Sequence, residues 1–149
     1  MTERSKIKGL HHLAIRAQDF EKTLQFYIEA LDFSVVHTWT LPEFNIKQAA
    51  MIKSWDGQTF IEIFDGAAAV PMEGEAAKAG EAVKTGALLH LAMSVVDAAD
   101  AYERCLHAGA SPYIAPMNLS LGHPPVSVRN ALVYSPNGEV IEFLEGQPF

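Results

Sequence analysis

The chain has 149 residues, of which 49% are hydrophobic, so a packed core is expected and global disorder is not. Lys and Arg total 11 against 18 Asp and Glu, a net charge of −7, which argues against non-specific nucleic-acid binding because that requires a positive field. The single cysteine, Cys105, cannot form an internal disulfide, and no stretch is long and apolar enough for a transmembrane helix. We therefore expect a cytoplasmic protein with no nucleic-acid or membrane partner.

The first half of the chain predicts one strand, one helix and three further strands. HLAIR (12–16) is typical of a strand, and FEKTLQFYIEAL (20–31) has the apolar spacing of an amphipathic helix that Asp19 can cap. Strand-like runs follow at 33–40, 46–54 and 58–64. The next segment is rich in Ala, Gly and charged residues, which predicts a linker with at most one weak helical stretch.

The second half predicts the same order of elements. A strand beginning near residue 90 precedes a helical pattern at 98–110, in which Cys105 is expected to be a buried core residue. Strand-like runs follow at 110–115, 126–135 and 139–145. The Pro-flanked segment PMNLSLGHPP (116–125) is expected to be a lid or a loop that contacts substrate.

Two pairs of similar segments show that the halves are repeats. HLAIRAQD (12–19) and HLAMSVVD (90–97) lie 78 residues apart, and IEIFDG (61–66) and IEFLEG (141–146) lie 80 residues apart. Because both pairs keep their order at nearly the same offset, we predict an α+β fold of two tandem βαβββ modules. Module 1 covers about residues 7–66, the linker about 67–86 and module 2 about 87–146.

Four polar residues stand at repeat-equivalent positions on otherwise apolar strand faces. Glu62 and Glu142 each alternate with hydrophobic residues, and His12 and His90 occupy matching places in the first strand of each module. A carboxylate on an apolar face is costly unless it is paired, solvated or bound to a cation. Two imidazoles and two carboxylates form a plausible site for one divalent cation with a coordination position left for substrate.

The remaining histidines have no such partner. His11 adjoins His12, but Leu89 occupies the equivalent position in the second half, so we expect His11 on the other face of the strand. His37 and His107 are expected to be surface residues.

From Ile7 to Gly146 these segments resemble the vicinal oxygen chelate superfamily, which includes glyoxalase I, methylmalonyl-CoA epimerase, extradiol dioxygenases, fosfomycin-modifying enzymes and bleomycin-binding proteins. The resemblance implies a single domain over residues 1–149 whose paired modules form a U-shaped, partly open β-barrel cleft. It also implies a homodimer and one divalent metal ion, which could be Ni, Zn, Co, Mn or Fe. The ligands that the resemblance implies are His12, Glu62, His90 and Glu142.

This His/Glu/His/Glu set matches the pattern of glyoxalase I. The resemblance implies a lyase or isomerase that stabilises an enediolate of a small α-oxo or hydroxy (thio)carbonyl substrate, with Glu142 as the first candidate for the base and Glu62 as the second. The alternatives are an epimerase of an acyl-CoA-type substrate, an extradiol-type dioxygenase and a non-catalytic protein that binds a small molecule such as a drug. The site could form within one chain or across a dimer interface.

Three further residues are candidates for substrate binding. Arg16 matches an arginine that holds the glutathione carboxylate in bacterial glyoxalase I, and His123 and Arg129 are candidate contacts near the expected loop. The asparagine that binds glutathione in that family falls on Gly66 here, so the resemblance does not identify the thiol.

Overall fold

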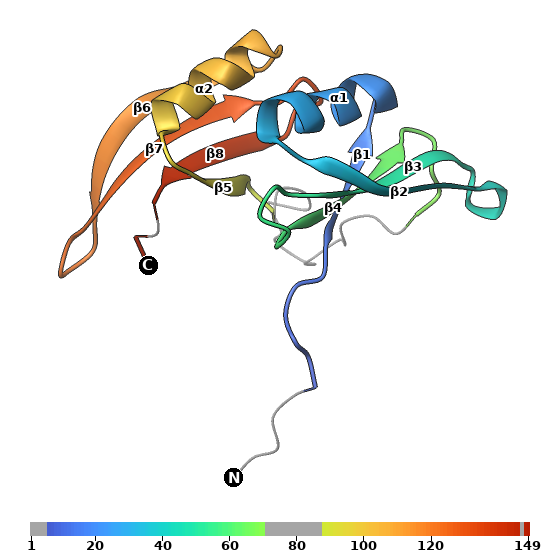
Figure 1. Cartoon of the computed structure of the whole chain (residues 1–149), viewed down its shortest axis with the longest axis horizontal. Coiled ribbons are helices and arrows are strands. Elements are labelled where there is room, and N and C mark those ends of the chain that lie inside the picture. Colours follow the sequence, from blue (N-terminus) through green and yellow to red (C-terminus); the bar gives the residue numbers. More distant parts are fainter. Residues whose placement is uncertain (1–5, 71–87, 147) are drawn as a thin grey trace, which may run out of the picture.

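The computed structural model describes residues 6–70, 88–146 and 148–149, and both halves fold into the same sequence of elements (Figure 1). Most of the expected linker, with its weak helical stretch, lies outside the described residues. In module 1 the elements are β1 (Leu13–Ala17), α1 (Phe20–Leu31), β2 (Ser34–Leu41), a 3-10 turn (Pro42–Phe44), β3 (Ile46–Lys53) and β4 (Phe60–Asp65). In module 2 they are β5 (Leu91–Val95), α2 (Ala98–His107), β6 (Ser111–Leu121), β7 (Val126–Tyr134) and β8 (Val140–Glu145).

Each module contains one four-stranded sheet, and the two sheets share a topology. Their strand orders are β1-β4-β3-β2 and β5-β8-β7-β6, with the first two strands of each order parallel. Ala14 pairs with Glu62 in the first sheet and Ala92 pairs with Glu142 in the second, so the registers agree as the repeat predicts. The α+β fold of two tandem βαβββ modules is confirmed, and the two sheets do not close into one barrel.

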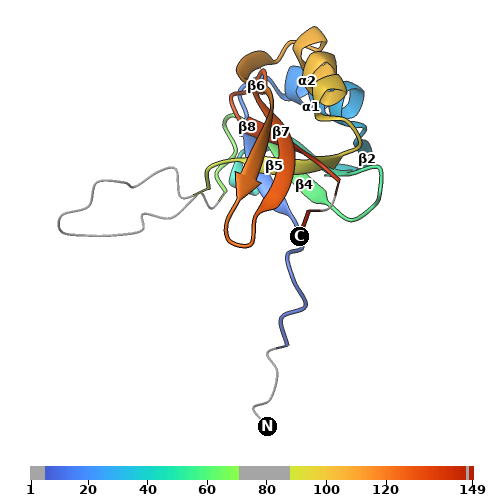
Figure 2. The same cartoon turned by 90° about the vertical axis from the view of Figure 1, so that its left-hand side faces the viewer.

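The two helices cover the same side of both sheets and lie next to each other (Figures 1 and 2). Each begins after an aspartate: the Asp19 carboxylate accepts a hydrogen bond from the Lys22 backbone N–H, as predicted, and Asp97 accepts one from that of Asp100. These carboxylates satisfy donors that the first turn of a helix leaves unpaired. Neither helix, nor any other in the described part of the chain, is long and apolar enough to cross a membrane.

One hydrophobic core lies beneath the helices and includes residues of both modules. Ile61 and Ile63 of β4 and Ile141 and Phe143 of β8 are fully buried in this single cluster. Cys105 lies in the same core, as expected, and burial raises the pKa of its thiol to about 12. The modules therefore stabilise each other instead of forming two separate cores.

The modules are also joined by the turn before β8. The Asn137 side chain accepts a hydrogen bond from the Gln18 backbone N–H at 3.0 Å and donates one to the Arg16 carbonyl at 2.8 Å. The corresponding turn of module 1 contains Asp56, whose carboxylate accepts from the Ser54 hydroxyl and a backbone N–H of its own turn. An amide can both donate and accept across the junction, whereas an ionised carboxylate can only accept, so the two junctions differ.

The prediction of a loop over 116–125 is wrong for most of that segment. β6 continues to Leu121 and pairs with β7, so the connecting turn is confined to residues 122–125. Prolines at both ends made the segment resemble a loop, but β6 is an edge strand and its register is irregular between Pro112 and Met117. Edge strands and bulges tolerate proline because the missing N–H costs no ladder hydrogen bond there.

Candidate functional site: two histidine–glutamate pairs

Strand alternation places both glutamates on the sheet faces that point away from the helices, here called the open faces. Ile61 and Ile63 point into the core, so Glu62 between them points the other way, and Glu142 is placed likewise in β8. The side chains of Glu62 and Glu142 are 18% and 17% exposed, respectively. Both carboxylates are thus held on rigid central strands but remain accessible.

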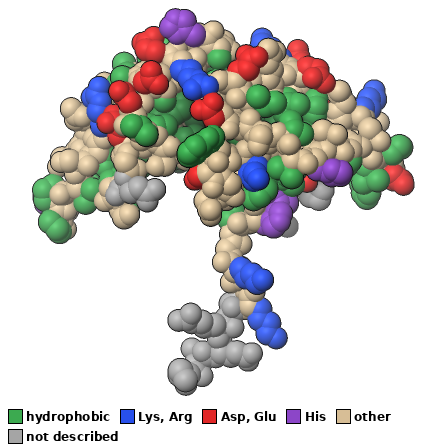
Figure 3. Space-filling model, viewed as in Figure 1, with side chains coloured by type: hydrophobic (Ala, Val, Ile, Leu, Met, Phe, Trp, Pro, Cys, Tyr) green, Lys and Arg blue, Asp and Glu red, His purple; other side chains and the backbone are tan. Residues whose placement is uncertain are grey.

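Each glutamate has its predicted histidine beside it. His12 Nε2 lies 3.8 Å from Glu62 Oε1, and His90 Nε2 lies 3.0 Å from Glu142 Oε2. His12 directly precedes β1 and His90 directly precedes β5, and those strands pair with β4 and β8. The same local architecture therefore generates both pairs. Figure 3 shows histidine side chains on the side away from the helices, near the point where the N-terminal segment leaves the body.

The two pairs do not meet within one chain. Within residues 6–70, 88–146 and 148–149, no group of three or more His, Cys, Asp or Glu side chains is placed to hold a metal ion. Imidazole and carboxylate are suitable ligands for Zn, Fe, Co, Ni and Mn ions. Each pair therefore provides half of the predicted ligand set, and the donor chemistry fits a divalent cation only when the two halves are combined.

Module 1 supports its histidine with a second one. His11 Nδ1 lies 2.8 Å from His12 Nδ1, and the His11 ring stacks on Phe60, which shares a strand face with Glu62. The prediction that His11 lies on the other face is wrong, because β1 begins only at Leu13 and strand alternation does not extend to the two histidines.

Module 2 supports its glutamate instead. Asn130 of β7 donates a hydrogen bond from Nδ2 to Glu142 Oε1 at 2.9 Å. Sequence reasoning missed this residue, although a signal was present: Asn130 interrupts an apolar strand face in the same way as Glu62 and Glu142 do.

The two predicted arginine contacts bind partners other than the histidine–glutamate pairs. The Arg16 guanidinium donates to the carbonyls of Gly66 and Ala68, and so holds the chain that leaves β4. Arg129 forms an ion pair with Glu145, whose carboxylate also accepts from the first backbone N–H of α2. His123 is exposed in the turn between β6 and β7.

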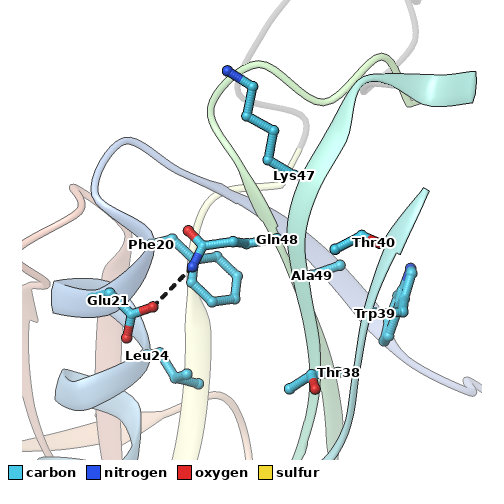
Figure 4. A pocket seen from close by; sticks show the side chains of 9 residues that line it. All are labelled: Phe20, Glu21, Leu24, Thr38, Trp39, Thr40, Lys47, Gln48 and Ala49. Carbon is cyan, nitrogen blue, oxygen red and sulfur yellow. Dashed lines mark hydrogen bonds between the residues drawn. The ribbon is translucent and has the colours of Figure 1, made fainter. Parts of the chain in front are cut away.

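Two hollows lie in the described surface, and the second is lined by Ala92, the cross-strand partner of Glu142. One, of about 520 Å³, lies between the start of α1 and strands β2 and β3, where Glu21 accepts a hydrogen bond from Gln48 (Figure 4). The other, of about 670 Å³, lies between the modules, beside Trp55 and the start of α2. None of the four predicted ligands lines either of these two hollows.

Comparisons with known proteins agree with this fold. Residues 9–143 match the family described as the Glyoxalase/Bleomycin resistance protein/Dioxygenase superfamily. No curated protein matches the sequence.

Several solved structures share the fold at low sequence identity. A glyoxalase I mutant from Zea mays is 16% identical with a TM-score of 0.63, and the match covers 89% of this chain but only 43% of the maize chain. The fosfomycin resistance protein FosX from Listeria monocytogenes, complexed with Mn(II) and sulfate, is 16% identical with a TM-score of 0.60, over 95% of this chain and 94% of that chain. A glyoxalase family protein from Enterococcus faecalis is 24% identical with a TM-score of 0.64, over 93% of this chain and 98% of that chain.

Proposed function

Because the chain belongs to the Glyoxalase/Bleomycin resistance protein/Dioxygenase superfamily, we propose that it is a divalent-metal-dependent lyase or isomerase. The observation that carries the proposal is the pair of histidine–glutamate contacts at repeat-equivalent positions, His12 with Glu62 and His90 with Glu142. A carboxylate beside a neutral imidazole on an accessible strand face is a suitable half-site for a cation.

We propose further that a second copy of the chain completes the site. Within one chain no third ligand joins either pair in the part that the structure describes, and neither hollow reaches the pairs. If the open face of module 1 lies against the open face of module 2 from the other copy, two ligands from each copy meet and substrate is shielded from water. A two-fold dimer then contains two equivalent sites.

The reaction that these residues support is the transfer of a proton between adjacent carbons. The Glu142 carboxylate removes a proton from the carbon next to a carbonyl, and the electron pair of the broken C–H bond moves toward the carbonyl oxygen, which gives an enediolate or enolate. The protonated Glu142 then returns the proton to the neighbouring carbon or to the opposite face of the same carbon. When bound, a divalent cation supplies positive charge that stabilises the developing oxyanion. Glu62 is the second candidate for the base.

The substrate class is a small α-oxo or hydroxy (thio)carbonyl compound, or an acyl thioester. Two observations weigh against a glutathione conjugate in particular. Arg16 is occupied by two backbone carbonyls, and a Cβ at Gly66 would approach the Ala17 carbonyl oxygen to 3.3 Å, so a larger residue at position 66 would be crowded.

Mixed dimers of two inactivated chains test this proposal. One chain carries His12→Ala with Glu62→Ala, and the other carries His90→Ala with Glu142→Ala. Each chain alone is expected to lose tight Co²⁺ binding. The mixed dimer joins the intact module 2 of one chain to the intact module 1 of the other. Co-expression should therefore restore about one site per mixed dimer.

The outcomes separate the parts of the proposal. Wild-type protein that neither retains a divalent ion after chelator-free purification nor gains thermal stability from Co²⁺, Mn²⁺, Ni²⁺ or Zn²⁺ would refute the metalloenzyme. Mixed dimers without restored binding would refute the shared site. Turnover assays with methylglyoxal plus glutathione, methylglyoxal plus other thiols, and acyl-CoA esters distinguish the substrates, and Glu142→Gln should abolish whichever turnover is found.

A further inference from the structure

Asn130 is a polar side chain in a position where the fold requires an apolar one. It lies in β7 between Val128 and Leu132, which share its strand face, and it is only 7% exposed. Its Oδ1 atom is buried and has no hydrogen-bond partner among the described residues. An unpaired buried oxygen destabilises a folded protein, so the asparagine is unfavourable as a packing residue.

The equivalent position in module 1 shows that the sheet can form without an asparagine there. Asn130 pairs with Leu144 across the sheet, and in module 1 the corresponding partner of Phe64 is Ala49. Ala49 is buried and leaves no polar atom unpaired. Since the same sheet is built with alanine at this position in module 1, the backbone does not require an amide there.

The one hydrogen bond that Asn130 donates to another side chain is directed at Glu142. Its Nδ2 lies 2.9 Å from Glu142 Oε1, while the other carboxylate oxygen, Oε2, lies 3.0 Å from His90 Nε2. The amide must face the carboxylate with its NH₂ group, because the reverse orientation would place two acceptor oxygens together. This requirement leaves the Asn130 oxygen on the buried side without a partner.

We infer that Asn130 is a positioning residue that fixes one oxygen of Glu142 so that the other is presented to the bound cation and to substrate. The inference rests on the proposed function of Glu142. An uncharged donor holds the carboxylate in one rotamer without forming an ion pair, so the group keeps its negative charge for a cation or a proton. In module 1, Ala49 stands at the corresponding position and has no side-chain donor for Glu62.

The main test is a double-mutant cycle on the full-length protein with Co²⁺ as the probe. Asn130→Leu keeps the approximate shape and removes the amide, and we expect Co²⁺ affinity to fall about tenfold or more. In a Glu142→Gln background the same substitution should have no further effect, because the carboxylate that Asn130 holds is already gone. Asn118→Leu, on the neighbouring strand and exposed, is the matched control and should leave affinity unchanged.

The stability of the metal-free protein to urea is a second measurement. If Asn130 only stabilised the fold, its replacement would lower the urea midpoint. Asn130→Leu should leave the urea midpoint unchanged or raise it, since the unpaired buried oxygen is removed. A lower midpoint, an unchanged Co²⁺ affinity, or an equal loss of affinity in both backgrounds would each overturn the inference.

A third measurement keeps the inference separate from the proposed function. In metal-free protein, the Asn130 side-chain amide resonances should shift when Glu142 is changed to Ala, because the hydrogen bond to the carboxylate is lost. Absence of such a shift would refute the contact itself. Wild-type protein that binds no Co²⁺ would refute the metalloenzyme and with it the role of Asn130, even if the hydrogen bond is present.

Discussion

At the scale of single residues, the two half-sites have the same ligands and different supports. An imidazole that binds a cation through Nε2 must carry its proton on Nδ1, and that proton needs an acceptor. In module 1 the adjacent His11 is placed to be this acceptor, because its Nδ1 lies 2.8 Å from that of His12. In module 2 the residue before His90 is Leu89, which cannot take this role. The adjacent histidines therefore act together, with His11 holding the ring that faces Glu62.

Replacement of His11 tests this tautomer directly. His11→Phe preserves an aromatic ring to stack on Phe60 but removes the acceptor, whereas His11→Asn places an amide oxygen near the same point. In metal-free protein at about pH 8.5, where imidazoles are neutral, ring ¹⁵N shifts should show His12 as the Nδ1–H tautomer in wild type and His11→Asn, and as a mixture in His11→Phe. Leu89→Phe should not change His90. An unaltered His12 spectrum in His11→Phe would contradict the role of His11.

The two histidine–glutamate contacts could be predicted from the sequence, whereas the residues that flank them could not. Glu62 and Glu142 were recognised because each breaks an apolar face and because the repeat presents the anomaly twice. Asn130 breaks a face only once, and its counterpart Ala49 gives no warning. His11 was misplaced because the exact first residue of a strand is not determined by its composition. Comparison of the two repeats therefore reveals residues that both modules contain, and it does not reveal residues that only one module contains.

At the scale of elements, the turns before β4 and β8 explain why the two module junctions differ. The turn before β8 reaches module 1 through Asn137, which both donates to and accepts from the backbone between β1 and α1. In the other turn Asp56 binds only within its own turn, and the hollow of about 670 Å³ lies beside it. Both turns contain a glycine with positive φ, Gly57 and Gly138. The local sequence does not determine which turn bridges the modules, because that depends on packing between distant segments.

Exchange of the two polar turn residues measures this difference. Asn137→Asp loses the donor to the Arg16 carbonyl and places a second carboxylate beside Glu139, so we expect the free energy of unfolding to fall by about 1–3 kcal/mol. Asp56→Asn keeps an acceptor for the Ser54 hydroxyl and should change it by less than about 0.5 kcal/mol. Urea denaturation followed by circular dichroism measures both values. Equal effects of the two substitutions would show that Asn137 does not join the modules.

At the scale of the whole molecule, the residues that stabilise the fold and the histidine–glutamate pairs lie on opposite faces of the sheets. Besides a smaller cluster within module 1 (Ile46, Ala49, Phe64 and Ala68), the helix-covered faces of both sheets contribute to one shared hydrophobic cluster. The opposite faces contain the histidine–glutamate pairs, and none of these ligands belongs to that cluster. Ligand substitutions should therefore change binding more than folding, and core substitutions in either module should destabilise the entire chain.

Two matched core substitutions test whether the modules unfold together. Ile61 and Ile141 are fully buried at repeat-equivalent positions, so Ile61→Ala and Ile141→Ala should each lower the free energy of unfolding by about 2–5 kcal/mol. Both tryptophans, Trp39 and Trp55, belong to module 1, so their fluorescence reports that module while far-ultraviolet circular dichroism reports both. At equal protein concentration, Ile141→Ala in module 2 should shift the fluorescence transition as far as the dichroism transition. A fluorescence transition that stays at its wild-type midpoint would mean that module 1 remains folded without module 2, which a shared core does not permit.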